Sequence, residues 1–247
     1  MSGSSGVPVG VVGDHEAVVR AVETAGGVAH VGDAAAVVAA SPAAVVAIGE
    51  DALVDLVVER PDAPVLPVAA GRGPRSVPGM AVEPAVASLV SDDYDPVDLP
   101  VLSATAGGTG AQAVFDLTLV TEEPARISEF TVRAAGERVD RFRADGVTVG
   151  TPAGSRGYTR AAGGPLVHTG TGVVAVVPIA PFATEVDDWI LPEDAVELAV
   201  ERDEAPVELL ADGRSAGTVV ASDPVTIDRD GHLTVAVTAE SYGYYGD

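Results

Sequence analysis

Cysteine is absent from this 247-residue sequence, and so is lysine. Without cysteine the chain has no disulfide, no thiolate nucleophile and no cysteine-based zinc or iron–sulfur site. All 14 basic residues are arginine, against 37 aspartates and glutamates, which gives a formal net charge of −23. Such an acidic excess repels nucleic-acid phosphates and anionic lipids, so we expect neither a nucleic acid nor a membrane surface as partner.

Long apolar runs are also missing. No uninterrupted run approaches the roughly 18 apolar residues of a spanning helix, and the N-terminus MSGSSGVPVG lacks the basic and apolar regions of a signal peptide. We therefore expect a cytoplasmic protein. The acidic residues are dispersed through a chain that is 47% hydrophobic, which argues against a disordered acidic protein. This composition resembles that of proteins from extreme halophiles, whose cytoplasm is rich in salt.

The first 98 residues alternate short valine-rich runs with alanine-rich segments of helical length. Apolar runs occur at 7–12, 44–48 and 63–68, and segments with helical spacing, such as 15–26 and 51–59, separate them. Short apolar strands separated by helices are typical of a parallel sheet with helices on both faces. We therefore expect a doubly wound α/β domain over residues 1–98.

The periodicity changes to two from about residue 99 onward. Strand-length pieces with alternating or continuous apolar residues include 114–121, 137–144, 172–180 and 206–213, with turns such as ADGR between them. This predicts a β-rich, sandwich-like domain over residues 99–247, so the fold class is α/β plus all-β. The glycine-rich AGGTGAQ at 106–112 is expected to be a flexible insertion.

The stretch GTPAGSRGY, residues 150–158, contains three glycines, a proline, a threonine and a serine. It follows the predicted strand 147–149 and precedes RAAGGPLV, whose small residues would let a helix start close to the sheet. Main-chain N–H groups at such a start attract an anion or a ribose hydroxyl, because the first helical turn leaves them unpaired. A surface turn of the same composition is equally consistent with these residues.

Residues 143–168, RADGVTVGTPAGSRGYTRAAGGPLVH, resemble the central motif of the NAD kinase family. In that family an Asp-Gly, a Thr-Pro-Thr-Gly-Ser-Thr-Ala-Tyr run and a Gly-Gly-Pro follow one another at this spacing. The resemblance extends over residues 90–235 and is weak before them. It implies transfer of a phosphoryl group from ATP, with Mg²⁺, to the 2′-hydroxyl of the adenosine ribose of NAD, giving NADP. It also implies assembly into a homo-oligomer.

The resemblance assigns roles to residues of the second domain. Matching the motif position by position places Thr151, Gly154, Ser155 and Tyr158 along the dinucleotide site, with Asp145 bracing the end of the strand. Another match, the Asp212–Gly213 turn, is interpreted as a purely structural hairpin.

Two departures from the family pattern lie in this second domain. Phe115 stands where the family has an asparagine, while Asp116 keeps the acidic residue that follows it; together these family residues grip the dinucleotide. Arg156 replaces a threonine of the motif, and its guanidinium offers several donors to a phosphate. Arg156 would therefore suit a ligand that is already phosphorylated.

A third departure affects the phosphoryl donor. Where the family has Gly-Gly-Asp-Gly-Thr, this chain reads GEDAL, so that only Gly49 and Asp51 remain of the motif. By the resemblance, Asp51 is the catalytic carboxylate, which accepts the ribose proton or helps to hold Mg²⁺. The replacement Glu50 brings a negative charge to a phosphate site and tolerates positive φ poorly, unlike glycine.

Three functions therefore remain open. The first is an NAD kinase, active with ATP and Mg²⁺ despite the altered motif. The second is a protein that binds NAD or NADP without catalysis, as a sensor or regulatory subunit. A lipid or polyphosphate-using kinase of the same superfamily matches the Thr-Pro-x-Gly-Ser loop less well. We assign no residue as a metal ligand from spacing.

The charge itself makes a testable prediction. Because like charges destabilise a compact state unless counter-ions screen them, the thermal unfolding midpoint should rise when dilute buffer is replaced by molar KCl. Calorimetric scans over a KCl series would check this, and a midpoint independent of salt would contradict it.

Overall fold

The computed structural model describes residues 6–14, 16–123, 127–183, 185–202, 205–221 and 223–245, with only the main chain at position 109. The chain divides into two compact units. One comprises Met1–Leu99 together with His232–Asp247, and the other comprises Pro100–Gly231. The final residues thus belong with the first unit, an arrangement that a single cut after residue 98 does not describe.

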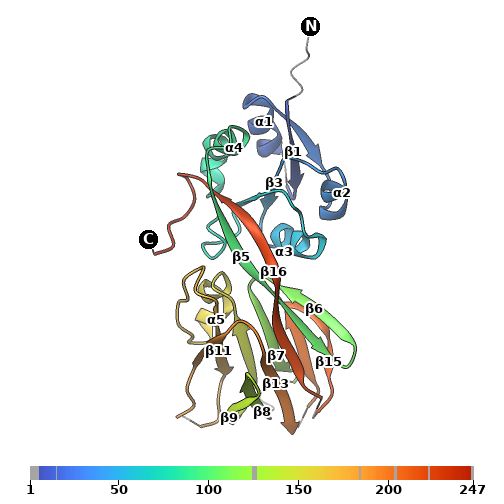
Figure 1. The fold of residues 1–247 in the computed structure, drawn as a ribbon, viewed down its shortest axis with the longest axis vertical. Coiled ribbons are helices and arrows are strands. Elements are labelled where there is room, and N and C mark those ends of the chain that lie inside the picture. The colour runs from blue at the N-terminus through green and yellow to red at the C-terminus, as the bar shows by residue number, and fades with distance from the viewer. Residues whose placement is uncertain are drawn as a thin grey trace. The chain divides into compact units, whose positions relative to one another are not determined.

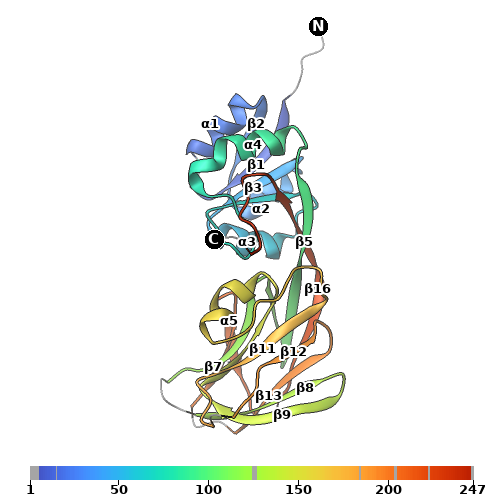
Figure 2. The ribbon, with the colours of Figure 1, turned by 90° about the vertical axis from the view of Figure 1, so that its left-hand side faces the viewer.

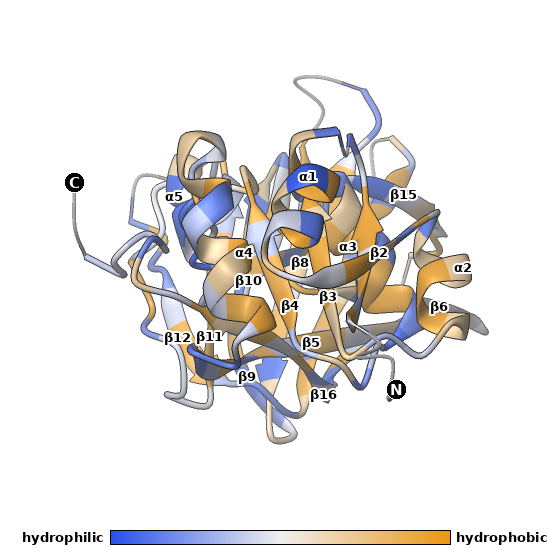
Figure 3. Cartoon of the chain, turned by 90° about the horizontal axis from the view of Figure 1, so that it is seen from above, coloured by the Kyte–Doolittle hydropathy of each residue, from blue (hydrophilic) through white to orange (hydrophobic). Residues whose placement is uncertain are grey.

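The first unit contains a parallel sheet (Figure 1). Its order is β2-β1-β3-β4, formed by β1 (Val7–Val12), β2 (Gly27–Val31), β3 (Ala44–Ile48) and β4 (Val65–Val68). The expected α/β architecture is therefore confirmed. Figure 3 shows β3 and β4 as strongly hydrophobic, as expected for strands that are covered on both faces.

Helices cover both faces of this sheet. They are α1 (Glu16–Thr24), α2 (Ala34–Ala39), α3 (Glu50–Glu59) and α4 (Val82–Val90), with the short 3-10 helix η1 (Gly79–Ala81) before α4. Helix α1 packs beside α4, and α2 packs beside α3. Side chains of α1 and α4 share one core with Val9, Val46 and Leu66 of the sheet. On the opposite face α2 contacts β1 and α3 contacts β3.

Helix α4 is absent from the sequence-based expectation. Its sequence VEPAVASLV has Pro84 at the third position. Proline lacks an N–H group, but the first turn of a helix leaves that group without an intrahelical partner, so proline is tolerated there. The apolar residues that follow, including Val86 and Leu89, are buried against the sheet.

The second unit is an antiparallel sandwich, which confirms the β-rich expectation (Figures 1 and 2). One sheet has the order β12-β11-β10-β7-β14-β15. Its strands are β7 (Asp116–Thr121), β10 (Gly146–Gly150), β11 (Val173–Ile179), β12 (Trp189–Pro192), β14 (Val207–Ala211) and β15 (Arg214–Val219). The core between the layers includes Leu117, Leu119 and Phe130, all fully buried.

The opposing layer is formed by β16, β13, β8 and β9, with β5 paired to β16 and β6 paired to β5. These strands are β5 (Asp95–Ala106), β6 (Thr109–Ala113), β8 (Ser128–Ala134), β9 (Glu137–Ala144), β13 (Val196–Arg202) and β16 (Val225–Val237). Strands β5 and β16 each run from one unit into the other. The end of β16 pairs in parallel with β4, through Val235 and Val65, in the first unit.

Two glycine-rich segments differ from expectation. AGGTGAQ is not an insertion: Gly107 and Gly108, with φ of +54° and +89°, form the hairpin turn that joins β5 to β6. Consecutive positive φ values are what a tight hairpin requires, and glycine adopts them readily. RAAGGPLV does not begin a helix either, because the short helix α5 (Tyr158–Ala161) starts before it and ends within it.

The chain after β16 is fastened to the loop that follows β4. The Tyr242 N–H donates to the carbonyl of Ser76 at 3.0 Å, and Arg75 Nε donates to the Tyr242 carbonyl at 2.8 Å. The Arg72 guanidinium lies 4.8 Å from the centre of the Tyr242 ring. These contacts all lie within the first unit, and Tyr244 beyond them is buried.

Gly10 explains how closely α2 approaches β1, and it provides a prediction. A Cβ atom at Gly10 would lie 2.3 Å from Cγ1 of Val37 on α2. Gly10→Ala should therefore lower the free energy of unfolding by about 1–3 kcal/mol, as overpacking does in tight cores. Gly79→Ala is the matched control, since nothing lies within 4 Å of its Cβ position. Equal urea midpoints for both variants in molar KCl would contradict this account of the packing.

Candidate functional site

The loop 150–158 is built around Thr151, which is completely buried. Its N–H donates to the Phe115 carbonyl at 2.9 Å, and its hydroxyl donates to the Val114 carbonyl at 2.5 Å. The same hydroxyl accepts the Gly154 N–H at 3.1 Å. Because these polar groups are bonded inside the protein, Thr151 fixes the loop against the chain that enters β7. Direct contact of Thr151 with a dinucleotide stays a prediction.

Gly154 and Ser155 continue this arrangement through the 3-10 helix η2 (Gly154–Arg156). A Cβ atom at Gly154 would lie 1.9 Å from the Phe115 carbonyl oxygen, so only glycine fits between the two segments. The hydroxyl of Ser155, also fully buried, donates to the Pro152 carbonyl at 2.7 Å and accepts the Val167 N–H at 3.1 Å. The glycine and the serine thus set the path of the main chain, and their predicted ligand contacts remain untested.

Asp116 opens strand β7, and its side chain is oriented by neighbouring hydroxyls. Thr118 Oγ1 lies 3.0 Å from Asp116 Oδ1 and 2.8 Å from Thr148 Oγ1 on the paired strand β10. Each hydroxyl has one hydrogen, so Thr118 donates to the carboxylate and Thr148 donates to Thr118. This pair of buried threonines holds the Asp116 carboxylate in one orientation.

Tyr158 lies near the Asp116 carboxylate, whose charge acts on its phenol. Arg156 is the last residue of η2. Tyr158 begins α5 and is about half exposed. Burial, and after it the negative charge of Asp116, raise the pKa of the Tyr158 phenol. Arg156 is partly exposed. Of the predicted dinucleotide residues, the structure brings Asp116, Thr151, Gly154, Ser155, Arg156 and Tyr158 together in one region.

Asp212 belongs to the same region, although sequence reasoning assigned it only to a turn. Its carboxylate accepts the N–H groups of Val114, Phe115 and Asp116 at 2.9, 2.7 and 3.0 Å. Burial raises the pKa of Asp212 to about 6, and the Asp116 charge adds to this, whereas the three N–H donors act in the opposite direction. The sequence signal that pointed to this residue was the family Asp-Gly turn.

Asp145 lies elsewhere. It precedes β10, whereas Thr151 follows the other end of that strand, which at about 3.3 Å per residue separates them by roughly 20 Å. The main chain of Asp145 bonds to both neighbouring strands, accepting the Thr121 N–H and donating to Ile179, each at 3.0 Å. Within one chain the structure does not bring Asp145 to the residues around Asp116.

The GEDAL segment forms the start of helix α3 in the first unit. Gly49 precedes the helix with a φ of +85°, and its N–H donates to the Val68 carbonyl. Glu50 and Asp51 occupy the first turn and are exposed, whereas Ala52 and Leu53 are buried. Acidic side chains in a first turn stabilise a helix through its dipole, so both carboxylates also have a structural role.

This segment lies at the carboxyl edge of the parallel sheet. In the strand order β2-β1-β3-β4 the connections turn in opposite directions from β1 and β3, and ligands of open α/β sheets bind where this happens. The loops after β1 and β3 touch there, since a Cβ at Gly13 would lie 2.6 Å from the Ile48 carbonyl oxygen. The position of Gly49 and Asp51 therefore fits a ligand site within the first unit.

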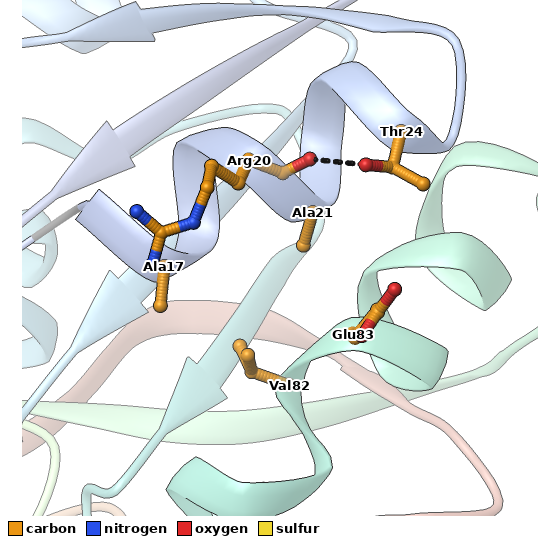
Figure 4. A pocket seen from close by; sticks show the side chains of 6 residues that line it. All are labelled: Ala17, Arg20, Ala21, Thr24, Val82 and Glu83. Carbon is orange, nitrogen blue, oxygen red and sulfur yellow. Dashed lines mark hydrogen bonds between the residues drawn. The ribbon is translucent and has the colours of Figure 1, made fainter.

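Two cavities are lined by residues outside both regions. One, of about 290 Å³, lies between α1 and α4 (Figure 4). Its lining residues are Ala17, Arg20, Ala21, Thr24, Val82 and Glu83. A second, of about 120 Å³, adjoins Pro42 and Arg60. Neither includes a predicted site residue.

The residues that the structure describes contain no group of three or more histidines, aspartates or glutamates arranged to hold a metal ion. No helix among them is both long enough and apolar enough to cross a membrane.

Sequence comparison places the region around Asp116 in a known domain. Residues 116–237 match the family model described as the ATP-NAD kinase C-terminal domain. The NAD kinase of Nitratidesulfovibrio vulgaris is 35% identical over 134 residues, which cover 54% of this chain and 47% of that protein. The NAD kinase of Methanosarcina barkeri is 31% identical over 120 residues, covering 47% and 43%. The matched segments thus span less than half of these relatives.

Comparison with solved structures extends to nearly the whole chain. An Archaeoglobus fulgidus NAD kinase in complex with ATP superposes with a TM-score of 0.77 at 20% identity, covering 92% of each chain. Yeast NADH kinase complexed with NADH gives a TM-score of 0.80 at 16% identity, covering 96% of this chain and 85% of that one. At such identities these superpositions establish a shared fold. The match of residues 116–237 and the 31–35% identity to the two curated relatives show that this part of the chain is a domain of the NAD kinase family.

Proposed function

We propose that this protein transfers the γ-phosphoryl group of ATP to the 2′-hydroxyl of the adenosine ribose of NAD, giving NADP and ADP. The observation that carries the proposal is the grouping of Asp116 and Tyr158 on a loop system fixed by Thr151 and Gly154, within the matched domain. The named ligands of the two solved relatives, ATP and NADH, support the same pair of substrates.

The acceptor dinucleotide would be held by the second unit. The Asp116 carboxylate, already oriented by Thr118, is suited to accept hydrogen bonds from ribose hydroxyls. The half-exposed Tyr158 ring offers an aromatic face to a base, and the Arg156 guanidinium offers donors to a phosphate. Phe115 cannot supply the amide of the family asparagine, so binding would depend more strongly on Asp116.

The donor would be held by the first unit, where Asp51 is the proposed general base. Its carboxylate would accept the proton of the 2′-hydroxyl as the ribose oxygen bonds to the γ-phosphorus and the bond from that phosphorus to ADP breaks. Mg²⁺ in such sites is held mainly by phosphates with one or two carboxylates, and Glu50 and Asp51 are exposed carboxylates at this position. The donor set therefore fits a nucleotide-bound Mg²⁺, which would neutralise phosphate charge.

A second candidate function is dinucleotide binding without catalysis. It is favoured by the first turn of α3, where Glu50 adds negative charge and the buried Leu53 replaces the family threonine. A hydroxyl is thereby lost, and an anionic donor meets two carboxylates at a helix start that would otherwise attract phosphate. Such a protein would sense or carry NAD or NADP.

The cellular setting is part of the proposal. We place the protein in a salt-rich cytoplasm as a homo-oligomer, without nucleic-acid or membrane partners, because the net charge of −23 disfavours polyanions and requires counter-ions.

One experiment separates the two functions. The protein is titrated calorimetrically with NAD and NADP in molar KCl, then supplied with NAD, ATP and Mg²⁺ and assayed for NADP. Binding with NADP formation supports the kinase, whereas binding without turnover supports the second candidate. Absence of dinucleotide binding would overturn both.

Asp51→Asn provides the first prediction from this mechanism. An amide cannot accept the proton, so NADP formation should fall by about 10²–10⁴-fold while NAD affinity stays within twofold. Asp55→Asn is the matched control, because Asp55 is exposed one turn further along α3. Unchanged NADP formation in the Asp51 variant would exclude this carboxylate as the base.

Gly154→Ala tests the acceptor site. Its Cβ would collide with the Phe115 carbonyl, so η2 must move away from Asp116, and NAD affinity should fall at least about tenfold. Gly110→Ala is the control within the same unit, since its nearest neighbour is the Ala104 carbonyl at 4.0 Å. Titration of both variants provides the measurement, and equal affinities would remove loop 150–158 from the binding site.

A further inference from the structure

Residues 114–116 join the end of β6 to the first residue of β7, and their main-chain N–H groups all point to one carboxylate. Asp212 Oδ2 accepts the Val114 N–H, and Asp212 Oδ1 accepts those of Phe115 and Asp116. The N–H of Asp212 in turn donates to the Asp116 carbonyl at 2.9 Å. Successive N–H groups that converge in this way form a concave anion site, and here the anion is a side chain of the protein itself.

The opposite side of this segment is held by Thr151. Its main-chain N–H and its hydroxyl bond to the carbonyls of Phe115 and Val114. All six polar main-chain groups of residues 114–116 therefore have partners in just two residues, Asp212 and Thr151. The position of this segment, and of the Asp116 side chain that it carries, depends on both.

The turn that contains Asp212 does not itself require a carboxylate. Asp212 and Gly213 have φ values of +49° and +74°. The β8–β9 hairpin contains Ala135 and Gly136 with φ values of +49° and +81°, so alanine serves the same turn position there. Forming the hairpin turn therefore does not explain why Asp212 makes three hydrogen bonds to residues 114–116, which belong to another part of the chain.

Retaining an ionisable group here works against folding. Burial favours the neutral acid, whose protonated oxygen is a weaker hydrogen-bond acceptor, and the neighbouring Asp116 adds like charge. The presence of a carboxylate at this buried position is explained if ligand binding depends on the geometry of residues 114–116. We propose that Asp212 is the positioning residue of the dinucleotide site, holding residues 114–116 so that Asp116 meets the ribose.

This proposal rests on the proposed binding of NAD or NADP, and Asp212 variants test it. Asp212→Asn keeps an oxygen for the Phe115 and Asp116 donors but turns an amide N–H₂ group toward the Val114 N–H. NAD affinity should therefore fall about tenfold, since hydrogen bonds to charged groups are lost. Asp212→Ala removes both acceptor oxygens, and with them all three hydrogen bonds, and should weaken binding further, so the conservative variant partly rescues affinity.

Asp228→Asn is the matched control. The Asp228 carboxylate also accepts a main-chain N–H, that of Ala195 at 2.8 Å, but in the other sheet of the second unit. Its NAD affinity should stay within twofold of the wild type. Affinities are titrated in molar KCl well below each thermal midpoint, so that a loss of stability alone does not change them. Wild-type affinity in both folded Asp212 variants would overturn the proposal.

Hydrogen exchange of the wild-type protein provides a test that needs no folded variant. The amides of Val114, Phe115 and Asp116 should be protected without any ligand, because Asp212 already bonds them. Rapid exchange at these three amides would overturn the proposal even if NAD binds. If the wild type binds neither NAD nor NADP, the proposed function fails, and the ligand role of Asp212 fails with it.

Discussion

The hydrogen bonds that fix residues 114–116 are the constraint on which the structure around Asp116 and loop 150–158 depends. Asp212 takes the three N–H groups, and Thr151 takes two of the carbonyls. The close approach of Gly154 to Phe115 follows from the same contacts, since the Thr151 hydroxyl also accepts the Gly154 N–H. A single polar cluster therefore sets both the orientation of Asp116 and the path of loop 150–158.

Much of the fold could be predicted from local pattern. The valine runs at 7–12 and 44–48 became β1 and β3, because short continuous apolar runs between helices have few other structural solutions. Helix α4 was missed because Pro84 was not recognised as a first-turn residue. AGGTGAQ was misjudged because glycine content alone does not distinguish a flexible loop from a tight hairpin such as the one at Gly107.

Less of the candidate site than of the fold could be predicted from the sequence. The family resemblance pointed to Thr151, Gly154 and Ser155. In the structure the hydroxyls of Thr151 and Ser155 bond to main-chain carbonyls, and Gly154 lets two main-chain segments approach closely, which the sequence alone does not reveal. The role of Asp212 depends on contacts with residues 96 to 98 positions earlier in the chain, a separation at which no periodicity carries information. Asp145 shows the opposite. It lies only six residues before Thr151 in the sequence, but strand β10 separates the two residues in the structure.

The two regions differ in how strongly the fold constrains their residues, and the family model matches the part of the chain, residues 116–237, that contains the region around Asp116. In the region around Asp116 the fold itself depends on particular residues, because a Cβ atom at Gly154 would collide with Phe115 and the Asp212 carboxylate bonds three main-chain amides. At the start of α3 the fold depends only on a glycine with positive φ and on buried apolar residues such as Leu53. The residues of the first turn of α3 can therefore change without disturbing the sheet.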